Sequence, residues 1–284
     1  MTLSENSLRV HPPDTLHEVL EYAKDVRGID FNAYRASTIE RRLALRLRKL
    51  GMQDLASYYR FLKKDPEEID ALVDALTVTV SHFFRDPFVF EALGNFVFPE
   101  LINTHKKDPL RIWCAGCARG EEAYSAAILL KEILSRETDS LDILIVATDI
   151  DRDALDYAEK AVYRADSLFE AKKGHLDRYF TKEADLFRLK DEIRSMVTFA
   201  YHDITTKPPK KGVFSDYHLV LCRNVLIYFN RAAQEHIISN LAGLLQNRGY
   251  LVLGEAETLP QQFSGGFGEI IPRTKIFRKG RCGE

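Results

Sequence analysis

Two acidic side chains follow a pair of glycines in segment 115–122, which reads Ala-Gly-Cys-Ala-Arg-Gly-Glu-Glu. Gly116 and Gly120 would let the backbone approach a ligand closely at the start of a helix. Their spacing differs from the G-x-G-x-x-G turn of dinucleotide-binding folds. Glu121 and Glu122 would repel a pyrophosphate placed at the helix N-terminus, where phosphates commonly bind. The segment therefore favours a ligand that carries a cation.

A third carboxylate, Asp149, lies 29 residues beyond Gly120, at the end of an apolar stretch. A carboxylate at the end of the second strand can accept both hydroxyls of a ribose. A nucleoside with a cationic tail that lacks phosphate has the chemistry of S-adenosylmethionine. Asp149 would hold its ribose, and Glu122 would meet its α-ammonium group. The alternative is that the acids complement a helix dipole and Asp149 caps the next helix, but their joint placement at adjacent strand ends favours the ligand.

Strands that alternate with helices are predicted to position these groups. The expected strands are 110–114, 141–148, 196–201, 217–222 and 249–253, and the expected helices are 121–135, 151–161 and 231–246. This order predicts a doubly wound α/β domain with a parallel sheet, whose ligands lie beyond the carboxyl ends of the strands. Segments 270–271 and 275–278 could pair as a closing hairpin, and a small β insertion is expected at about 179–196.

From about residue 15 to residue 93 the pattern is helical instead. In the predicted helix 38–50, Leu43, Leu47 and Leu50 form an apolar stripe. Arg42, Arg46 and Lys49 have the same spacing one position earlier, so they form a cationic stripe beside it. Shorter helices are predicted at 54–62 and 67–78. The sequence thus predicts a helical domain at 1–93 and an α/β domain at 94–284.

The charge of the chain is unevenly distributed. Lys and Arg number 40 against 42 for Asp and Glu, a formal net charge of −2, which argues against a general nucleic-acid-binding protein. Segment 31–64 nevertheless carries nine basic and two acidic residues, a net charge of +7 (9 − 2). Because this block is short and not interleaved with aromatic residues, nucleic acid is a poor candidate partner.

Cysteine content and hydropathy indicate the cellular compartment in which the protein is expected. The four cysteines, Cys114, Cys117, Cys222 and Cys282, are too few for a secreted disulfide framework. No apolar run reaches the roughly 18–20 residues of a membrane span, and no signal peptide is recognisable, so we expect a cytoplasmic protein. The Cys114-x-x-Cys117 pair has no second pair to complete a metal site, and we interpret both as small residues at a crowded turn.

Several motifs together resemble those of the CheR-type chemotaxis receptor glutamate O-methyltransferases over nearly the whole chain. The matching stretches are Thr38–Arg42 with the basic helix, Ser81–Pro87, Gly116–Ser125, Ala147–Asp151 and Cys222–Phe229. The resemblance implies a small all-α domain and a Rossmann-like methyltransferase domain that share S-adenosyl-L-methionine. It also implies that receptor glutamates are converted to methyl esters for sensory adaptation, with S-adenosyl-L-homocysteine as the product.

The resemblance also implies roles for single residues. Thr79, Ser81 and Arg85 should contact the methionine portion of the cofactor, Glu122 its amino group and Asp149 its ribose. Asp203 and Ile204 should lie by the adenine, and Arg223, Asn224 and Tyr228 should line the methyl-transfer site. Arg85 is expected to bind mainly the cofactor carboxylate, while Tyr228 and Arg223 are candidates for orienting the substrate. Arg119 and Ala123 depart from the threonine and proline usual in the glycine turn, and His82 and His202 are interpreted as spacers.

Methylation of a glutamate would need no general base, because the nucleophile has a reference pKa near 4.3 and is already ionised. The glutamate-rich helices of a receptor would be attracted by Arg42, Arg46 and Lys49. The alternative for this stripe is a solvated helix face paired with the acids of 65–74. Segment 179–196 is compact and lacks a glycine-rich loop, which predicts that no pentapeptide tether on the receptor is needed. A monomer is the default expectation for the oligomeric state. Metal ligands and membrane insertion are not expected.

The sequence is also compatible to different degrees with three other functions. The first is a methyltransferase of another carboxylate or of a small molecule, and the second is a signalling protein that binds S-adenosylmethionine without catalysis. The set Arg85, Glu122, Asp149 and Asn224 argues against loss of catalysis. A nicotinamide dehydrogenase is disfavoured by the acidic glycine turn.

Overall fold

The chain folds into two compact units, Met1–Val78 and Thr79–Glu284. The structure is a computed structural model, and it describes residues 13–77, 79–106, 108–135, 141–207 and 216–280. The division differs from the predicted boundary at 93. Phe83, Phe84 and Phe90 are buried in the core of the second unit, so segment 79–93 packs with that unit.

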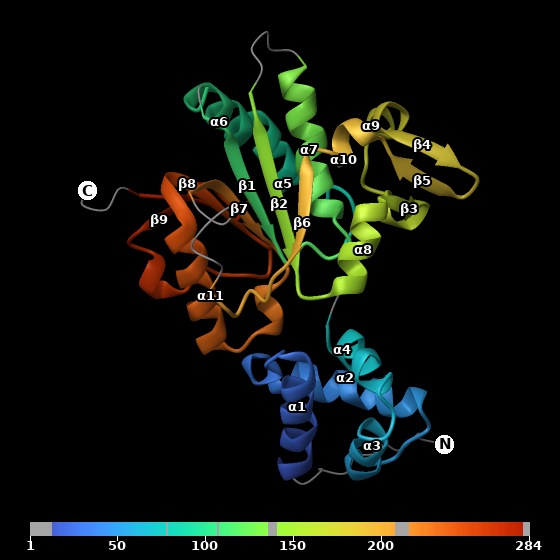
Figure 1. The fold of residues 1–284 in the computed structure, drawn as a ribbon. Helices are drawn as coiled ribbons and strands as arrows, with labels where there is room; N and C mark the ends of the chain where they lie inside the picture. The colour runs from blue at the N-terminus through green and yellow to red at the C-terminus, as the bar shows by residue number, and fades with distance from the viewer. Residues whose placement is uncertain (1–12, 78, 107, 136–140, 208–215, 281–284) are drawn as a thin grey trace, which may run out of the picture. The chain divides into compact units, whose positions relative to one another are not determined.

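The first unit consists of helices, as predicted. They are α1 (Pro13–Arg27), α2 (Ala36–Lys49), α3 (Leu55–Leu62) and α4 (Glu68–Leu76), with a 3-10 turn, η1 (Phe31–Ala33), after α1 (Figure 1). Asp54 caps α3, because its Oδ1 accepts the backbone N–H of Ser57 at 2.8 Å. Leu43 and Leu47 are buried, which confirms the apolar side of the predicted stripe, and α2 packs against α4.

The second unit contains a seven-stranded sheet in the order β6-β2-β1-β7-β8-β10-β9 (Figure 1). Its strands are β1 (Leu110–Ala115), β2 (Ile143–Asp149), β6 (Val197–Tyr201), β7 (Tyr217–Cys222), β8 (Leu245–Leu253), β9 (Phe267–Ile271) and β10 (Ile276–Lys279). The first five strands in the spatial order are parallel to one another, and β10 runs antiparallel to both of its neighbours, β8 and β9. The parallel sheet predicted from the alternation of strands and helices is thus observed in these five strands. The predicted closing hairpin adds β10 and β9 at one edge, because a short connection between strands can only reverse them.

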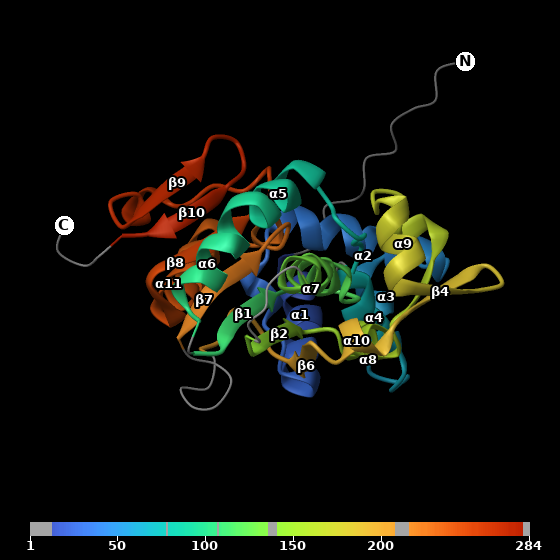
Figure 2. The same cartoon turned by 90° about the horizontal axis from the view of Figure 1, so that it is seen from above.

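Helices cover both faces of this sheet. Seen from above in Figure 2, α7 (Glu121–Leu134) and α11 (Arg231–Leu244) lie on opposite faces, and α8 (Arg152–Lys160) contacts β2 and β6. Ahead of β1 run α5 (Pro87–Ala92), a π-helical turn η2 (Leu93–Val97) and α6 (Phe98–Thr104). Every residue of β7 is buried, as expected for a strand covered on both sides. Within the described residues, no helix is long and apolar enough to span a bilayer.

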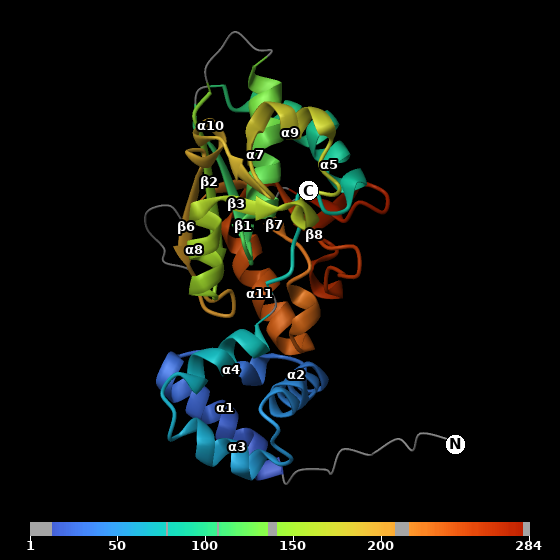
Figure 3. The ribbon, with the colours of Figure 1, turned by 90° about the vertical axis from the view of Figure 1, so that its right-hand side faces the viewer.

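The β insertion is larger than the predicted segment 179–196. It begins at β3 (Val162–Arg164), which pairs antiparallel with β5 (Leu186–Leu189). In this pairing Tyr163 lies opposite Phe187. Its other elements are η3 (Ala165–Ser167), α9 (Lys173–Tyr179), β4 (Phe180–Glu183) and α10 (Asp191–Arg194). Figure 3 shows the insertion beside α7, which α10 contacts.

Candidate functional site

The glycine turn after β1 packs tightly against the rest of the second unit. Gly116 has φ +75°, and a Cβ there would lie 2.5 Å from Cγ2 of Val225 on the loop after β7. Gly120 has φ +85°, and a Cβ there would lie 2.9 Å from both Ala158 and Phe199. Glycine is therefore required at both positions by conformation and by space.

Asp149 at the end of β2 holds this turn. Its Oδ2 accepts the backbone N–H of Ala118 at 2.7 Å, and its Oδ1 accepts that of Asp151 at 3.0 Å. Burial raises the pKa of Asp149 to about 6, although both N–H groups favour the charged form. The neighbouring side chain of Asp151, rather than that of Asp149, caps α8 by accepting the N–H of Ala154 at 2.9 Å.

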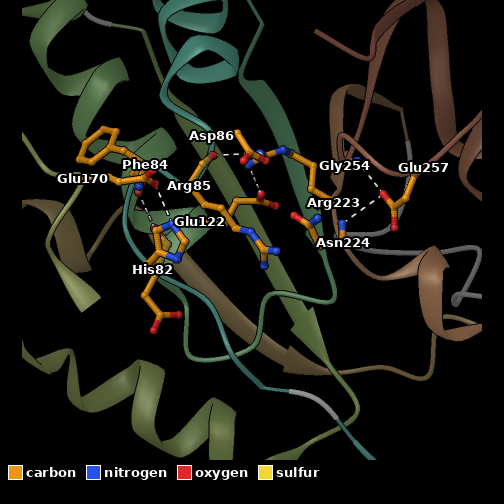
Figure 4. Close-up of polar contacts among 12 residues, drawn as sticks. His82, Phe84, Arg85, Asp86, Glu122, Glu170, Arg223, Asn224, Gly254 and Glu257 are labelled. Carbon is orange, nitrogen blue, oxygen red and sulfur yellow. Dashed lines mark hydrogen bonds and ion pairs between the residues drawn. The ribbon is translucent and has the colours of Figure 1, made fainter. Parts of the chain in front are cut away.

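Arg223, directly after β7, joins three segments of the chain (Figure 4). Its Nη1 donates to Oε2 of Glu122 at 2.8 Å, and its Nη2 donates to Oδ2 of Asp86 at 2.7 Å and to the carbonyl oxygen of Arg85 at 2.9 Å. The side chain of Arg223 is only 1% exposed. Burial raises the pKa of Glu122, and the guanidinium of Arg223 opposes that shift. The network brings Arg85, Glu122 and Arg223 together.

The segment that carries Arg85 is held on both sides. Phe84 and Asp86 have φ of 56° and 59°, a left-handed conformation that side chains seldom adopt. The N–H of Phe84 donates to Oγ of Ser125 at 2.9 Å. His82 is more than the spacer that the sequence suggests, because its Nε2 lies 2.7 Å from Oε2 of Glu170 in the insertion (Figure 4). The segment is thereby attached to both α7 and the insertion.

Asn224 also adopts a left-handed conformation, with φ 60°. Its backbone N–H donates to Oε2 of Glu257 at 3.1 Å, and that oxygen also accepts the N–H of Gly254 at 2.6 Å. Sequence reasoning missed Glu257. The signal that could have found it is its position just beyond β8, because the other carboxylates of the site also follow strand ends.

The remaining predicted site residues lie on neighbouring loops of the second unit. Asp203, after β6, accepts the N–H of Thr205 at 2.8 Å, and Ile204 is buried. Tyr228 is partly exposed at the end of η4 (Leu226–Tyr228), on the same loop as Arg223 and Asn224. Thr79 and Ser81 are half-buried at the start of the unit.

The cationic stripe of the first unit is largely turned inward. Arg46 forms a bidentate ion pair with Glu68, a carboxylate that also accepts the hydroxyl of Tyr58 at 2.7 Å. Arg42 donates to the carbonyl oxygens of Ala75 and Thr77 at 2.9 and 3.0 Å. Lys49 is exposed. Two of the three residues predicted to dock a receptor therefore bind α4 and its C-terminal end. Arg46 pairs with an acid of segment 65–74, as in the alternative interpretation, but this pair is buried rather than solvated, and Arg42 binds carbonyl oxygens instead of acids.

The buried cysteines fit the packing interpretation. Cys114, Cys117 and Cys222 are free and buried, and burial raises the pKa of each thiol. Across the described ranges, no cluster of three or more His, Cys, Asp or Glu residues could hold a metal ion. Cys282 lies outside the described residues.

Comparison with known families assigns both units. Residues 14–77 match the CheR methyltransferase all-alpha domain, and residues 79–271 match the CheR methyltransferase SAM-binding domain. The chain belongs to the CheR methyltransferase family. The family expected from the sequence motifs is thereby confirmed.

Three relatives show how far the similarity extends. A Pseudomonas putida protein named Cher3 is 35% identical over 88% of this chain and 91% of its own length. Chemotaxis protein methyltransferase 2 of Pseudomonas aeruginosa is 31% identical over 86% of this chain and 86% of its own length. An uncharacterized 104.1 kDa protein of Rhodobacter capsulatus is 31% identical over 96% of this chain, which spans only 28% of that longer protein.

The residues of the second unit fit S-adenosylmethionine as the cofactor of a CheR protein. A carboxylate offers about four acceptor positions, and Asp149 uses two of them for backbone N–H groups, which leaves room for two ribose hydroxyls. Glu122 has a second oxygen beyond the one bound by Arg223, and it could meet an ammonium group. The sequence expectation of this cofactor is supported by the family match and by these acceptors.

Proposed function

We propose that this protein transfers the methyl group of S-adenosyl-L-methionine to glutamate side chains of chemotaxis receptors and forms methyl esters. The printed names of several relatives, such as the Pseudomonas aeruginosa chemotaxis protein methyltransferase 2, support this substrate class. The observation that carries the proposal is the Arg223 network, which gathers Arg85 and Glu122 at the carboxyl edge of the sheet.

Different residues of the second unit would bind different parts of the cofactor. Asp149 would accept the ribose hydroxyls, Glu122 the α-ammonium group, and Arg85 would bind the carboxylate. By resemblance, Asp203 and Ile204 would lie by the adenine, and Thr79, Ser81 and Asn224 would complete the site. When bound, the cofactor supplies an electrophilic methyl group on a sulfonium.

The protein's contribution to the reaction is positioning, because a glutamate carboxylate needs no base at neutral pH. Orientation of two reactants in a closed site can supply roughly 7–11 kcal/mol. Arg223 is buried and committed to Glu122 and Asp86, so we assign it to holding the site rather than to orienting the substrate. Tyr228 is the better candidate for contact with the substrate, since it is partly exposed on the same loop.

The surface of the first unit that could dock a receptor differs from the stripe predicted from the sequence. Lys49 is exposed, and so are Arg41 and Arg48 on the same helix, with Leu45 between them. We propose that Arg41, Arg48 and Lys49 attract the acidic receptor helices, and that Arg42 and Arg46 stabilise the unit. The insertion has only Ala184 and Asp185 between β4 and β5, which supports docking without a pentapeptide tether. We further propose that the enzyme is cytoplasmic and monomeric.

Calorimetry with S-adenosylhomocysteine followed by methyl transfer tests the proposal. Isolated receptor signalling domains are incubated with the protein and methyl-labelled cofactor, and the label on the receptor is counted. Receptors whose methylation-site glutamates are changed to alanine serve as controls. Binding together with label that disappears in the alanine receptors is expected. Absence of binding would exclude every methyltransferase function, and binding without receptor labelling would exclude this substrate.

A further inference from the structure

Glu257 is a buried carboxylate whose partners are backbone N–H groups. It lies four residues beyond β8 and is 3% exposed. Its Oε2 accepts the N–H groups of Gly254 at 2.6 Å and Asn224 at 3.1 Å (Figure 4). Its Oε1 accepts the N–H group of Ile227 at 3.3 Å. Within the described part of the chain, no Lys, Arg or His forms an ion pair with it. Hydrogen bonds from backbone N–H groups therefore stabilise this carboxylate in place of a cationic side chain.

The same carboxylate joins the ends of two neighbouring strands. Asn224 and Ile227 belong to the loop after β7, and Gly254 follows β8. A Cβ at Gly254 would lie 2.7 Å from the backbone nitrogen of Asn224 and 2.9 Å from Oε2 of Glu257. The loops after β7 and β8 thus approach so closely that only glycine fits at position 254, and the carboxylate of Glu257 lies between them.

The loop that Glu257 holds has an unfavourable conformation of its own. Asn224 has φ 60°, a left-handed conformation that carries a conformational cost, although a smaller one for asparagine than for most other side chains. Hydrogen bonds on either side of it, to the N–H groups of Asn224 and Ile227, offset this cost. Arg223 directly precedes this turn, and its guanidinium holds Glu122 and the carbonyl of Arg85.

We propose that Glu257 is a positioning residue that fixes the Arg223–Asn224 turn and, through Arg223, the carboxylate of Glu122 that receives the cofactor. This inference rests on the proposed function. Both carboxylate oxygens of Glu257 accept hydrogen bonds from backbone N–H groups, so Glu257 need not touch substrate or cofactor. It acts on the cofactor site only through the turn.

Substitution Glu257→Gln tests this role, with Glu255→Gln as the matched control. Glu255 is exposed on the same loop. The glutamine keeps the shape of the side chain but turns an NH2 group toward N–H donors, and the loss of a hydrogen bond to a charged group typically weakens a site by tenfold or more. We expect Glu257→Gln to weaken S-adenosylhomocysteine binding at least about tenfold, and Glu255→Gln to change it less than about twofold. Circular dichroism on the same samples establishes that each variant is folded.

The outcomes separate this inference from the proposed function. A folded Glu257→Gln protein that binds S-adenosylhomocysteine like the wild type would overturn it, as would an equal loss in Glu255→Gln. If the Glu257→Gln protein does not fold, amide hydrogen exchange of the wild-type protein tests the positioning role instead. The amides of Asn224 and Ile227 should then exchange slowly without ligand and more slowly with S-adenosylhomocysteine. Fast exchange would refute the positioning role even if the wild type proves to be a methyltransferase.

Discussion

Asp149 must be ionised to serve as an acceptor for the glycine turn and for a ribose. Its pKa is raised to about 6 by burial, so the side chain is charged above that pH and protonated below it. A protonated carboxyl group gives up acceptor positions and gains a donor.

S-adenosylhomocysteine affinity should therefore fall as the pH drops below about 6, by up to about tenfold for each pH unit. Calorimetry at pH 5, 6, 7 and 8 would measure this change. The Asp149→Asn variant should bind weakly, and its affinity should depend less on pH than that of the wild type. Wild-type affinity that stays constant from pH 7 to pH 5 would contradict the role given to Asp149.

Glu121 is a buried acid beside the site, and it lacks a partner for Oε2. Burial raises its pKa from 4.5 to about 7. The folded state therefore binds a proton more tightly than the unfolded state. Its contribution to stability is greatest below pH 4.5 and is lost as the pH rises toward 7.

The Glu121→Gln variant should remove this loss, which amounts to roughly 3 kcal/mol at most by the linkage relation. We expect it to be more stable than the wild type at pH 8 and to lose that advantage at pH 5. Urea unfolding followed by the fluorescence of Trp113, the single tryptophan, reports on the second unit. Equal effects at both pH values would argue against a titrating Glu121.

At the scale of elements, most strands and helices followed from periodicity. The helix predicted at 54–62 is observed at Leu55–Leu62, and the strand predicted at 217–222 is observed unchanged. The start of the insertion was not predicted, because β3 has only three residues and is defined by its pairing with a distant strand. Hairpins and insertions depend on partners that a local pattern does not specify.

The candidate site was predictable in part for the same reason. Asp149 and Glu122 follow predicted strands and carry charges that suggest a ligand. Glu257 and the inward direction of Arg46 depend on what surrounds them, and their residue types alone do not indicate it. A basic stripe on a helix cannot be distinguished in sequence from a row of internal ion pairs.

The glycine turn is the element whose alteration should matter most. Gly116→Ala would place a Cβ against Val225 at a φ of +75°. Backbone strain and overpacking together should cost about 2–4 kcal/mol of stability. Gly174→Ala is the matched control, since a Cβ there meets no atom within 4 Å. Thermal stability should fall, and S-adenosylhomocysteine binding should weaken, in the first variant only. The double variant Gly116→Ala with Val225→Ala should recover part of the loss.

At the scale of the whole molecule, charge on the first unit has two different uses. Arg46 balances Glu68, which is 4% exposed, whereas Arg41 and Lys49 face solvent. Breaking a buried pair by removing one partner typically costs 3–5 kcal/mol.

Charge reversal at Arg41 and Lys49 should raise KM for the receptor several-fold and leave S-adenosylhomocysteine affinity unchanged. The increase should shrink at high salt, because exposed charges are screened. Arg46→Glu should instead lower the melting temperature of the first unit. Steady-state kinetics and calorimetry distinguish the two classes. Unchanged KM in the Arg41 and Lys49 variants would refute docking through this surface.

The central claim is that the methyl group arrives on a receptor glutamate as an ester. Its most direct measurement is the alkaline release of label from receptor that has been methylated with methyl-labelled cofactor. Because carboxylate esters hydrolyse in alkali whereas N-methyl and ether linkages do not, we predict that the label leaves as volatile methanol. Alanine at the methylation-site glutamates should abolish that release. Label that resists alkali, or that persists in the alanine receptors, would contradict the assignment.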